Sequence, residues 1–487
     1  MESRREGGLG VVELVPTGIA GFDELLGGGL VAGTMALVEG APGTGKTTLG
    51  LGFIHHGVVA RGEPGLVLTF EEVPQQLYRD ALNFGWDLRR LVEAGTLSVI
   101  CLTPDVLQRY LADPEEIWQR LARGISPRRV LIDSVTHLRQ LTDDPVRLRE
   151  ILNLFLSGMR RHGLTALLLK ELESRGGESI PFEEYAVDAV IRLTYAPQGD
   201  DGARQRFLEV LKTRGQEHVP GRHSFAFAEN GLRVYPRPRP RPITPSRGER
   251  HVFLGIAGLD QLFEGGIPTP AQVMLVGDTG VGKTLSALLF THEGLTCGEW
   301  CGFVDCDEVP AMTRRTLAHF GLVTTAHERL GRLRFIDAYG RAGGGEEIAV
   351  HDPSNLDEFL NVEDRLLDTL RARGEVRLCV DGLSTILATS RYQAAIEFVA
   401  ARLHNLRARQ IVGLDTYTAG VLEPRLMNAI AQHYDLVLSM RFGEVHGAPI
   451  RLAAVEKYRF GKVAREEHIF SVDPRIGIIF HKAALQG

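Results

Sequence analysis

Short apolar runs alternate along the chain with longer stretches in which apolar residues recur at helical spacing. In the first half, these runs predict strands over residues 36–38, 65–69, 97–101, 130–132, 166–169 and 189–193. Leu148, Ile151, Leu152 and Phe155 keep the i, i+3, i+4, i+7 spacing of a helix with one buried face. Strands separated by helix-length segments predict a mostly parallel, twisted sheet covered by helices, so the expected fold class is α/β.

The chain repeats itself once. The sequence TGIAGFDELLGGGL at residues 17–30 returns as LGIAGLDQLFEGGI at residues 254–267. Further matches follow in the same order: LTFEEVP (68–74) with VDCDEVP (304–310), VLIDSV (130–135) with LCVDGL (378–383), and KTR (212–214) with KYR (457–459). The period is far too long for a solenoid, so the repeat predicts a duplicated domain.

The two copies are separated by the sequence PRPRPRP at residues 236–242. Alternating prolines exclude a helix and favour an extended, semi-rigid spacer. The expected domains are residues 1–235 and 251–487, joined by a Pro/Arg linker over residues 236–250. We expect the linker arginines to be solvated; docking on an acidic surface is the alternative.

Each half contains a glycine-rich phosphate-binding loop. GAPGTGKT (40–47) and GDTGVGKT (277–284) both fit the pattern G-x-x-x-x-G-K-[ST], and each lies between an apolar run and a helix-compatible stretch. Glycines let successive backbone N–H groups converge on phosphates at the positive end of a helix. The residues expected to bind nucleotide are Gly40, Gly43, Thr44, Gly45, Lys46, Thr47 and Thr48 in the first half, and Gly277, Thr279, Gly280, Val281, Gly282, Lys283, Thr284 and Leu285 in the second.

The cofactor expected at each loop is ATP with Mg²⁺. The lysines would reach the β and γ phosphates, and the Thr47 and Thr284 hydroxyls would bind the metal. Asp133 and Asp381 each end an apolar run, where a strand would bring a carboxylate to the same metal. The alternative for these aspartates is that they cap a helix or turn.

A pair of carboxylates follows the second predicted strand of each half: Glu71 and Glu72, then Asp307 and Glu308. Carboxylates beside the phosphate site can polarise a water or a hydroxyl for attack on the γ-phosphate. The alternative is a solvated acidic turn at the start of a helix.

A basic pair lies far along the chain from each loop: Lys212 with Arg214, and Lys457 with Arg459. At this spacing both side chains of a pair point to one face of a strand. We expect a neighbouring subunit to present them to the γ-phosphate; an ordinary basic strand face is the alternative.

Composition narrows the class of protein. The chain has 487 residues, 44% of them hydrophobic and 24% charged, which indicates a globular protein with more than one domain. No apolar run approaches the roughly 20 residues of a membrane span, and the charged N-terminus does not resemble a signal peptide, so we expect a cytoplasmic protein. The five cysteines favour reduced thiols over a disulfide framework or a metal cluster. The formal charge of −6 disfavours nucleic-acid binding without removing it as an alternative.

Taken together, these motifs resemble the KaiC-like branch of the RecA/DnaB superfamily. The resemblance runs from about residue 17 to residue 479 and includes FEE (70–72), NFGWD (83–87), IDS (132–134) and LKTRG (211–215). It implies two RecA-like P-loop domains, and a homo-hexamer with ATP at the subunit interfaces. It also implies catalysis by the four acidic residues above, with the two basic pairs acting in trans.

The resemblance is incomplete where the clock protein of this family phosphorylates itself. Residues 419–438 contain no Ser or Thr, and the long C-terminal tail of the family is expected to be absent. The leading hypothesis is therefore an oligomeric ATPase whose state is read by a protein partner that the sequence does not identify. The alternatives are a serine/threonine kinase, a DNA-handling recombinase-like ATPase and a nucleotide-gated scaffold.

The two loops are not expected to be equally active. The second half has Asp307 in place of Glu71, and Gly382 in place of Ser134 after the strand-end aspartate. Aspartate is one methylene shorter, and a displacement of about 1 Å can cost on the order of a hundredfold in rate. The faster hydrolysis is expected at the first loop.

Overall fold

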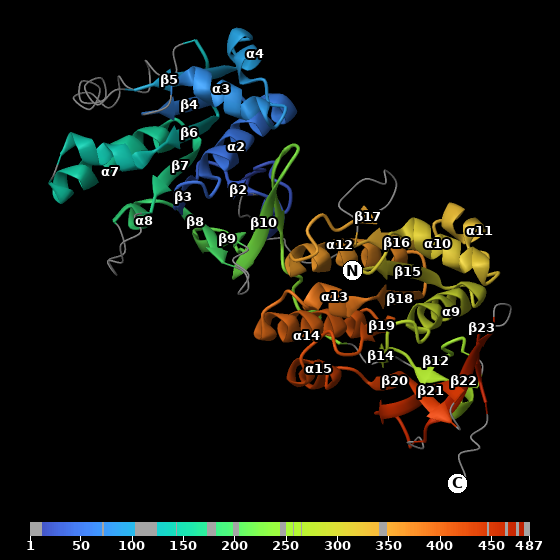
Figure 1. Cartoon of the computed structure of the whole chain (residues 1–487). Helices are drawn as coiled ribbons and strands as arrows, with labels where there is room; N and C mark the ends of the chain where they lie inside the picture. Colours follow the sequence, from blue (N-terminus) through green and yellow to red (C-terminus); the bar gives the residue numbers. More distant parts are fainter. Residues whose placement is uncertain are drawn as a thin grey trace, which may run out of the picture. The chain divides into compact units, whose positions relative to one another are not determined.

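The structure is a computed structural model that describes residues 12–70, 73–102, 124–142, 144–172, 182–197, 204–243, 250–256, 258–263, 265–339, 348–445, 448–462, 466–473 and 477–481. Two compact units are present, and the chain passes from the first to the second between Pro236 and Arg237. Each unit is built around one large sheet (Figure 1). No helix among these residues is long and apolar enough to cross a membrane.

The first unit contains a nine-stranded sheet in the order β11-β10-β9-β8-β3-β7-β6-β4-β5, counted over the described part of the chain. From β8 to β5 the neighbours are parallel, whereas β8 to β11 form an antiparallel extension. Its strands are β3 (Met35–Gly40), β4 (Gly65–Thr69), β5 (Leu97–Cys101), β6 (Arg129–Asp133), β7 (Thr165–Glu171), β8 (Ala189–Pro197), β9 (Arg204–Thr213), β10 (Arg222–Ala228) and β11 (Gly231–Tyr235), and β1 (Leu14–Val15) pairs with β2 (Leu30–Val31).

Helices cover both faces of this sheet. Alternate residues of the central strands pack with α2 on one face and with α7 on the other, so the parallel strands are apolar throughout. The helices are α1 (Phe22–Leu25), α2 (Lys46–Arg61), α3 (Pro74–Leu82), α4 (Leu88–Glu93), η1 (Val135–Leu141), α7 (Pro145–Arg161) and α8 (Phe182–Ala186). The α/β prediction is confirmed, and each of the six predicted strands lies within an observed one.

The second unit repeats the same plan. Its sheet has ten strands within the described ranges, in the order β17-β16-β15-β18-β19-β14-β20-β21-β22-β23, and is parallel from β17 to β20. The strands are β14 (Gln272–Gly277), β15 (Trp300–Asp305), β16 (Leu333–Asp337), β17 (Ile348–Ala349), β18 (Val376–Asp381), β19 (Val412–Thr418), β20 (Leu436–Val445), β21 (Ala448–Tyr458), β22 (His468–Asp473) and β23 (Gly477–Phe480), with β12 (His251–Val252) paired to β13 (Ile267–Pro268). The helices are η2 (Asp260–Leu262), α9 (Lys283–Thr296), α10 (Pro310–His319), α11 (Thr325–Arg329), α12 (Leu356–Arg371), α13 (Leu383–Leu387), α14 (Tyr392–Ala408) and α15 (Pro424–Ala431).

The repeated segment that precedes each loop has a structural role. The Asp23 carboxylate accepts hydrogen bonds from the Thr17 backbone N–H (2.7 Å) and hydroxyl (2.6 Å). Asp260 accepts from the backbone N–H groups of Leu254 (2.6 Å) and Gly255 (2.9 Å). In both units this aspartate therefore satisfies backbone donors where the chain enters the domain.

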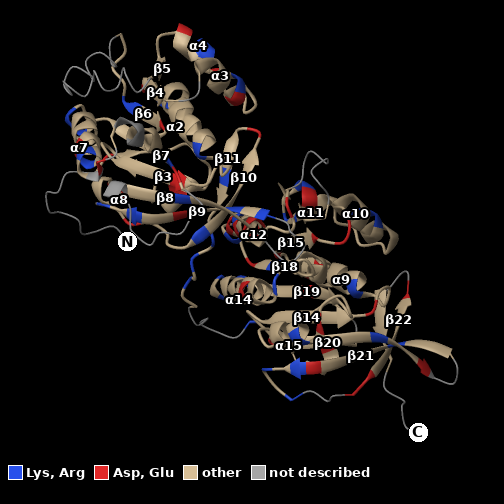
Figure 2. Ribbon diagram, turned by 60° about the vertical axis from the view of Figure 1, so that its left-hand side comes forward, with Lys and Arg blue, Asp and Glu red and all other residues tan. Residues whose placement is uncertain are grey.

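Two linker arginines contact the second unit. Arg237 Nε donates to Asp357 Oδ1 on α12 at 2.9 Å, and Arg241 lies 3.4 Å from Asp368 of the same helix. The basic linker and the acidic residues can be followed in Figure 2. These two side chains stay 53% and 45% exposed, as expected of a solvated linker, but they also pair with carboxylates of α12, which is the acidic-surface alternative.

This contact predicts a salt-dependent protection of the linker. The Arg237→Ala, Arg241→Ala double variant is expected to be cleaved several times faster by trypsin after Arg247, the first linker arginine that is not followed by a proline, because exposed ion pairs are each worth under about 1 kcal/mol and their loss frees the segment. Limited proteolysis at low and high salt measures this effect. Arg239→Lys is the matched control, since it keeps the charge between the two contacts. Equal cleavage of the parent and the double variant at low salt would contradict the prediction.

Candidate functional site

The first glycine-rich loop joins β3 to α2. Gly43 and Gly45 have positive φ angles of 74° and 104°, which side chains other than glycine rarely adopt. Lys46 begins α2, and its Nζ donates to the carbonyl oxygens of Gly40 (2.9 Å) and Ala41 (3.0 Å). The loop thus wraps around its own lysine at the N-terminus of a 16-residue helix.

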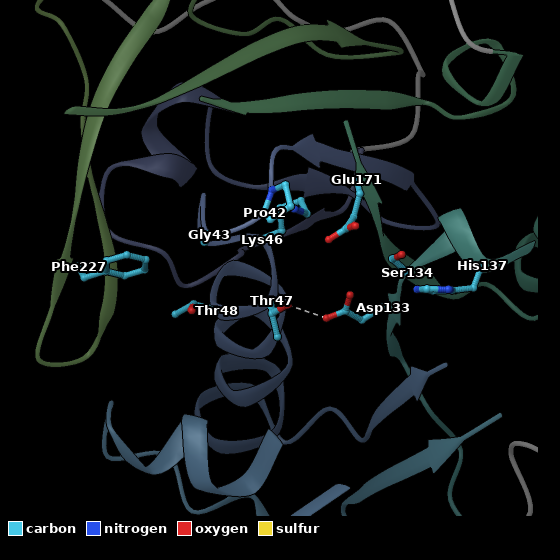
Figure 3. A pocket seen from close by; sticks show the side chains of 11 residues that line it. Pro42, Gly43, Lys46, Thr47, Thr48, Asp133, Ser134, His137, Glu171 and Phe227 are labelled. Carbon is cyan, nitrogen blue, oxygen red and sulfur yellow. Dashed lines mark hydrogen bonds between the residues drawn. The ribbon is translucent and has the colours of Figure 1, made fainter. Parts of the chain in front are cut away.

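A hydroxyl and a carboxylate meet beside this loop. Thr47 Oγ1 donates to Asp133 Oδ2 at 2.7 Å, although the two residues are 86 positions apart. Asp133 ends β6 and Glu171 ends β7, the strand between β6 and β3, so both carboxylates lie at the end of the sheet where the loop leaves β3. These side chains line a cavity of about 340 Å³, and Figure 3 shows Thr47 and Asp133 facing each other in it.

Burial and charge oppose each other in this cavity. Burial lowers the pKa of Lys46, while Glu171 and Asp133 act to raise it. Burial also raises the pKa of Asp133, and the hydrogen bond from Thr47 and the charge of Lys46 counteract that rise. A buried lysine beside two carboxylates is therefore positioned to receive an anion and a cation together.

The second loop has the same geometry. Gly280 and Gly282 have φ angles of 78° and 125°, and Lys283 Nζ donates to Gly277 O (3.0 Å) and Asp278 O (2.9 Å). Burial lowers the pKa of Lys283, opposed by Asp381, Asp307 and Asp278. The Asp381 carboxylate accepts a hydrogen bond from Thr416 at 2.6 Å, and burial raises the pKa of Asp381 while Thr416 and Thr284 act to lower it.

Not every residue expected to bind nucleotide presents its side chain to the cavity. In the first loop, Gly43, Gly45, Lys46, Thr47 and Thr48 line it, whereas the buried Thr44 hydroxyl donates to Ala41 O at 2.8 Å. In the second loop, Val281 and Leu285 are buried in the core, so only their backbone N–H groups could contact a phosphate. The loop pattern predicts backbone contacts at these positions but not side-chain contacts.

The second site carries an additional buried carboxyl group. Asp305 ends β15 and pairs in register with Asp381, in the position that Thr69 occupies beside Asp133. Burial raises the pKa of Asp305 to about 8, and its Oδ1 accepts from Thr313 at 2.7 Å. The second site therefore carries a buried carboxyl group where the first site has Thr69, and the two sites differ at this strand end.

The carboxylates expected to be catalytic can be placed in only one unit. Glu71 and Glu72 lie outside the described residues. In the second unit, Asp307 is exposed and accepts a hydrogen bond from Thr385, and Glu308 follows it at the start of the segment leading to α10. The charge of Asp307 acts to raise the pKa of Lys283.

The two basic pairs lie near the starts of β3 and β14 in the sheet register, whereas the loops leave the ends of these strands. Lys212 Nζ donates to Glu184 O and Val187 O, both at 2.8 Å, at the C-terminal end of α8. In the second unit, Lys457 Nζ donates to Ala431 O (3.1 Å) and Gln432 O (3.0 Å) at the end of α15.

The arginine of each pair also donates to a backbone carbonyl oxygen near the end of a helix. Arg214 Nη2 donates to Tyr185 O at 3.2 Å, and Arg459 Nη2 to Gln432 O at 2.9 Å. Within one chain, the basic pairs therefore cap helix C-termini, where cations are favoured. They cannot reach the loop of their own unit, so their action on a nucleotide in trans stays a prediction.

Several residues of the first cavity were not predicted from the sequence. Glu171, His137 and Phe227 all line it. Glu171 had a usable signal, because it follows a predicted central strand, and such strands end at the ligand edge of an α/β sheet. Phe227 had none, since it comes from the antiparallel extension, on the other side of the loop in Figure 3.

A second cavity of about 280 Å³ adjoins the first, and Thr48 lines both. Aromatic rings connect the two: Phe227 lies 6.1 Å from Phe84, Phe84 lies 5.2 Å from Trp86, and Trp86 stacks on His55 at 5.5 Å, all measured between ring centroids. The planar ring of a ligand that extends from the loop on this side would contact these aromatic side chains.

The donor set suits a hard cation held jointly with phosphate. Each site offers one hydroxyl and one carboxylate, Thr47 with Asp133 and Thr284 with Asp381. Among the described residues, no group of three or more His, Cys, Asp or Glu could hold a metal alone. Mg²⁺ fits such a site, because it usually keeps several waters and binds through one or two protein oxygens plus substrate phosphates.

Comparison with known families agrees with this geometry. The family model described as the KaiC ATPase matches residues 15–239 and, a second time, residues 252–484. The chain belongs to the KaiC ATPase family. The expected resemblance is therefore confirmed, and so is the interpretation as two tandem ATPase domains.

Curated relatives match over most of the chain. "Circadian clock oscillator protein KaiC" of Picosynechococcus sp. is 30% identical over 473 residues, covering 94% of this chain and 87% of the relative. The protein of the same name from Thermostichus vulcanus is 30% identical over 462 residues, covering 92% and 85%. That of Synechococcus elongatus is 28% identical over 478 residues, covering 94% and 88%. The similarity thus includes both units and the segment between them.

Proposed function

We propose that the chain binds Mg²⁺ and ATP at both loops, hydrolyses ATP, and assembles into a nucleotide-dependent ring in the cytoplasm that signals its state to a protein partner. The observation that carries the proposal is the convergence of Lys46, Thr47 and Asp133 in one cavity, with the same convergence at Lys283, Thr284 and Asp381. A structural glycine turn would have no need to bring a threonine and an aspartate 86 residues apart to 2.7 Å beside a buried lysine.

The residues of the first site would have distinct roles in binding and hydrolysing ATP. Backbone N–H groups of the loop and Lys46 would hold the β and γ phosphates, and Thr47 and Asp133 would hold Mg²⁺. When bound, the cation neutralises charge on the phosphate oxygens. Glu71 or Glu72 would accept the proton of the attacking water, and Glu171 would orient Lys46 and that water from the end of β7. The adenine ring of the bound ATP would extend toward Phe227 and the aromatic rings behind it.

The position of the basic pairs supports the proposed ring. Because Lys212 and Arg214 lie near the start of β3 in the sheet register, whereas their own loop leaves its end, a γ-phosphate could be contacted by them only from a neighbouring subunit. An arginine finger is worth about 10³ to 10⁵ in rate in related P-loop enzymes. A site completed by its neighbour would couple hydrolysis to assembly, which is the property that a partner protein can read.

Assembly is the direct test. Addition of ATP and Mg²⁺ is expected to convert the purified chain to a homo-hexamer, measured by size-exclusion chromatography with light scattering. The Lys46→Ala, Lys283→Ala double variant should stay smaller, and Arg149→Ala, at an exposed arginine of α7, should behave as the parent. A parent chain that remains monomeric at saturating ATP and Mg²⁺ would refute the ring.

A further inference from the structure

Three residues that differ between the two halves lie together in the second site. Asp307, Gly382 and Thr385 occupy the places of Glu71, Ser134 and His137. The structure supports this correspondence. The backbone N–H of Glu171 donates to Thr136 Oγ1 in the first unit, and the backbone N–H of Thr418 donates to Ser384 Oγ in the second, both at 3.0 Å.

Gly382 makes room for the carboxylate of Asp307. Its φ is 84°, and a Cβ built on it would lie 2.3 Å from Asp307 Cγ and 2.4 and 2.6 Å from the two carboxylate oxygens. The Asp307 carboxylate therefore fills the space that a side chain at position 382 would need. The corresponding residue of the first unit is Ser134, which is buried.

Thr385 holds the carboxylate in that space. Its Oγ1, on α13, donates to Asp307 Oδ1, and both side chains are exposed to the nucleotide edge of the sheet. Gly382 is itself fixed, because its N–H donates at 2.8 Å to Thr416 Oγ1, which in turn donates to Asp381. Asp307 is thus attached to the same turn that carries the metal-binding aspartate.

A carboxylate held against this turn is poorly placed to take a proton from water. One oxygen already accepts from Thr385, and the side chain is a methylene shorter than glutamate. Resting on the function proposed above, we propose that Thr385 is a positioning residue that keeps Asp307 withdrawn, so that the second site retains ATP and hydrolyses it slowly.

The experiment isolates the second site with Lys46→Ala. In this background, Thr385→Val removes the hydroxyl at nearly constant shape, and Thr385→Ser keeps it. The valine variant is expected to raise kcat about tenfold, the factor that one hydrogen bond to a charged group typically represents, with KM for ATP unchanged. The serine variant is expected to match the parent, and adding Asp307→Asn to the valine variant should remove the gain.

The outcomes separate the two proposals. An unchanged or lower kcat in Thr385→Val, or a gain that survives Asp307→Asn, would overturn the role of Thr385. A chain that binds ATP but hydrolyses none, in the parent and in both single-site backgrounds, would instead refute the proposed ATPase function. Thermal unfolding of the valine and serine variants verifies that both are folded.

Discussion

Lys46→Ala is expected to remove most of the ATP turnover of the chain, whereas Lys283→Ala should leave most of it. Each lysine is the buried cation of its loop, and losing one preorganised charge from such a site typically costs about 10² to 10³ in kcat. Total turnover after Lys46→Ala should therefore approach that of the second site alone. Steady-state phosphate release from the two variants and the parent measures the division.

The expected asymmetry has a structural origin at the second loop. Asp307 is held by Thr385 and lies over Gly382. A filter-binding assay with labelled ATP should show that each single variant still binds nucleotide at its intact loop. Intact turnover in Lys46→Ala together with its loss in Lys283→Ala would show that the faster site is the second.

The sequence was sufficient to predict the parallel strands of the first sheet. Strands such as β4 and β6 are buried on both faces, so they appear as continuous apolar runs that end at the phosphate edge. The loop lysines, threonines and strand-end aspartates could be predicted because their roles depend on position within this pattern. Their convergence in space follows from the order of the strands.

The antiparallel extension was harder to predict. β9 reads RQRFLEVLKT and has exposed, intermediate and buried residues mixed along it, so it lacks an apolar run. Phe227 reaches the first cavity through this extension, and no local pattern places β10 beside a loop 180 residues earlier. Contacts of this kind depend on sheet order rather than on residue type.

Ion pairing was the other unpredictable element. The linker arginines contact α12, and Lys212 and Lys457 cap helices, because of carboxylates and carbonyl groups that lie far away in the sequence. A basic pattern alone does not distinguish a helix cap from a finger residue. The two roles can coexist only if a neighbouring subunit draws the side chains away from the helix ends.

Arg402→Met is expected to destabilise the second unit by about 3–5 kcal/mol, because it removes the cation from a fully buried ionic cluster. Arg402 on α14 donates to Glu363 Oε2 on α12 and to Asp415 Oδ2 on β19, both at 2.6 Å. All three side chains are about 1–2% exposed. Urea unfolding of the full chain, with hydrogen exchange of β19 to identify the second unit, measures the loss.

The same variant should also become more sensitive to pH. Burial raises the pKa of Glu363, and the charge of Arg402 opposes that rise. Without Arg402 the folded state holds its proton to higher pH than the unfolded chain does, so the free energy of unfolding falls as pH rises above the ordinary glutamate value of 4.5. Arg402→Met should therefore be more stable near pH 5.5 than near pH 8, with a steeper decline than the parent.

Arg441→Met is the matched control. Arg441 pairs with Glu467 at 2.6 Å, but the two side chains are 51% and 39% exposed, so its loss should cost under about 1 kcal/mol and add no pH dependence. The contrast matters for the proposed function because Asp415 adjoins Thr416, which donates to Asp381, the proposed metal ligand. If the two methionine variants unfold at the same urea concentration, the buried cluster contributes no more than a surface pair, and β19 must be fixed by its neighbours β14 and β18 alone.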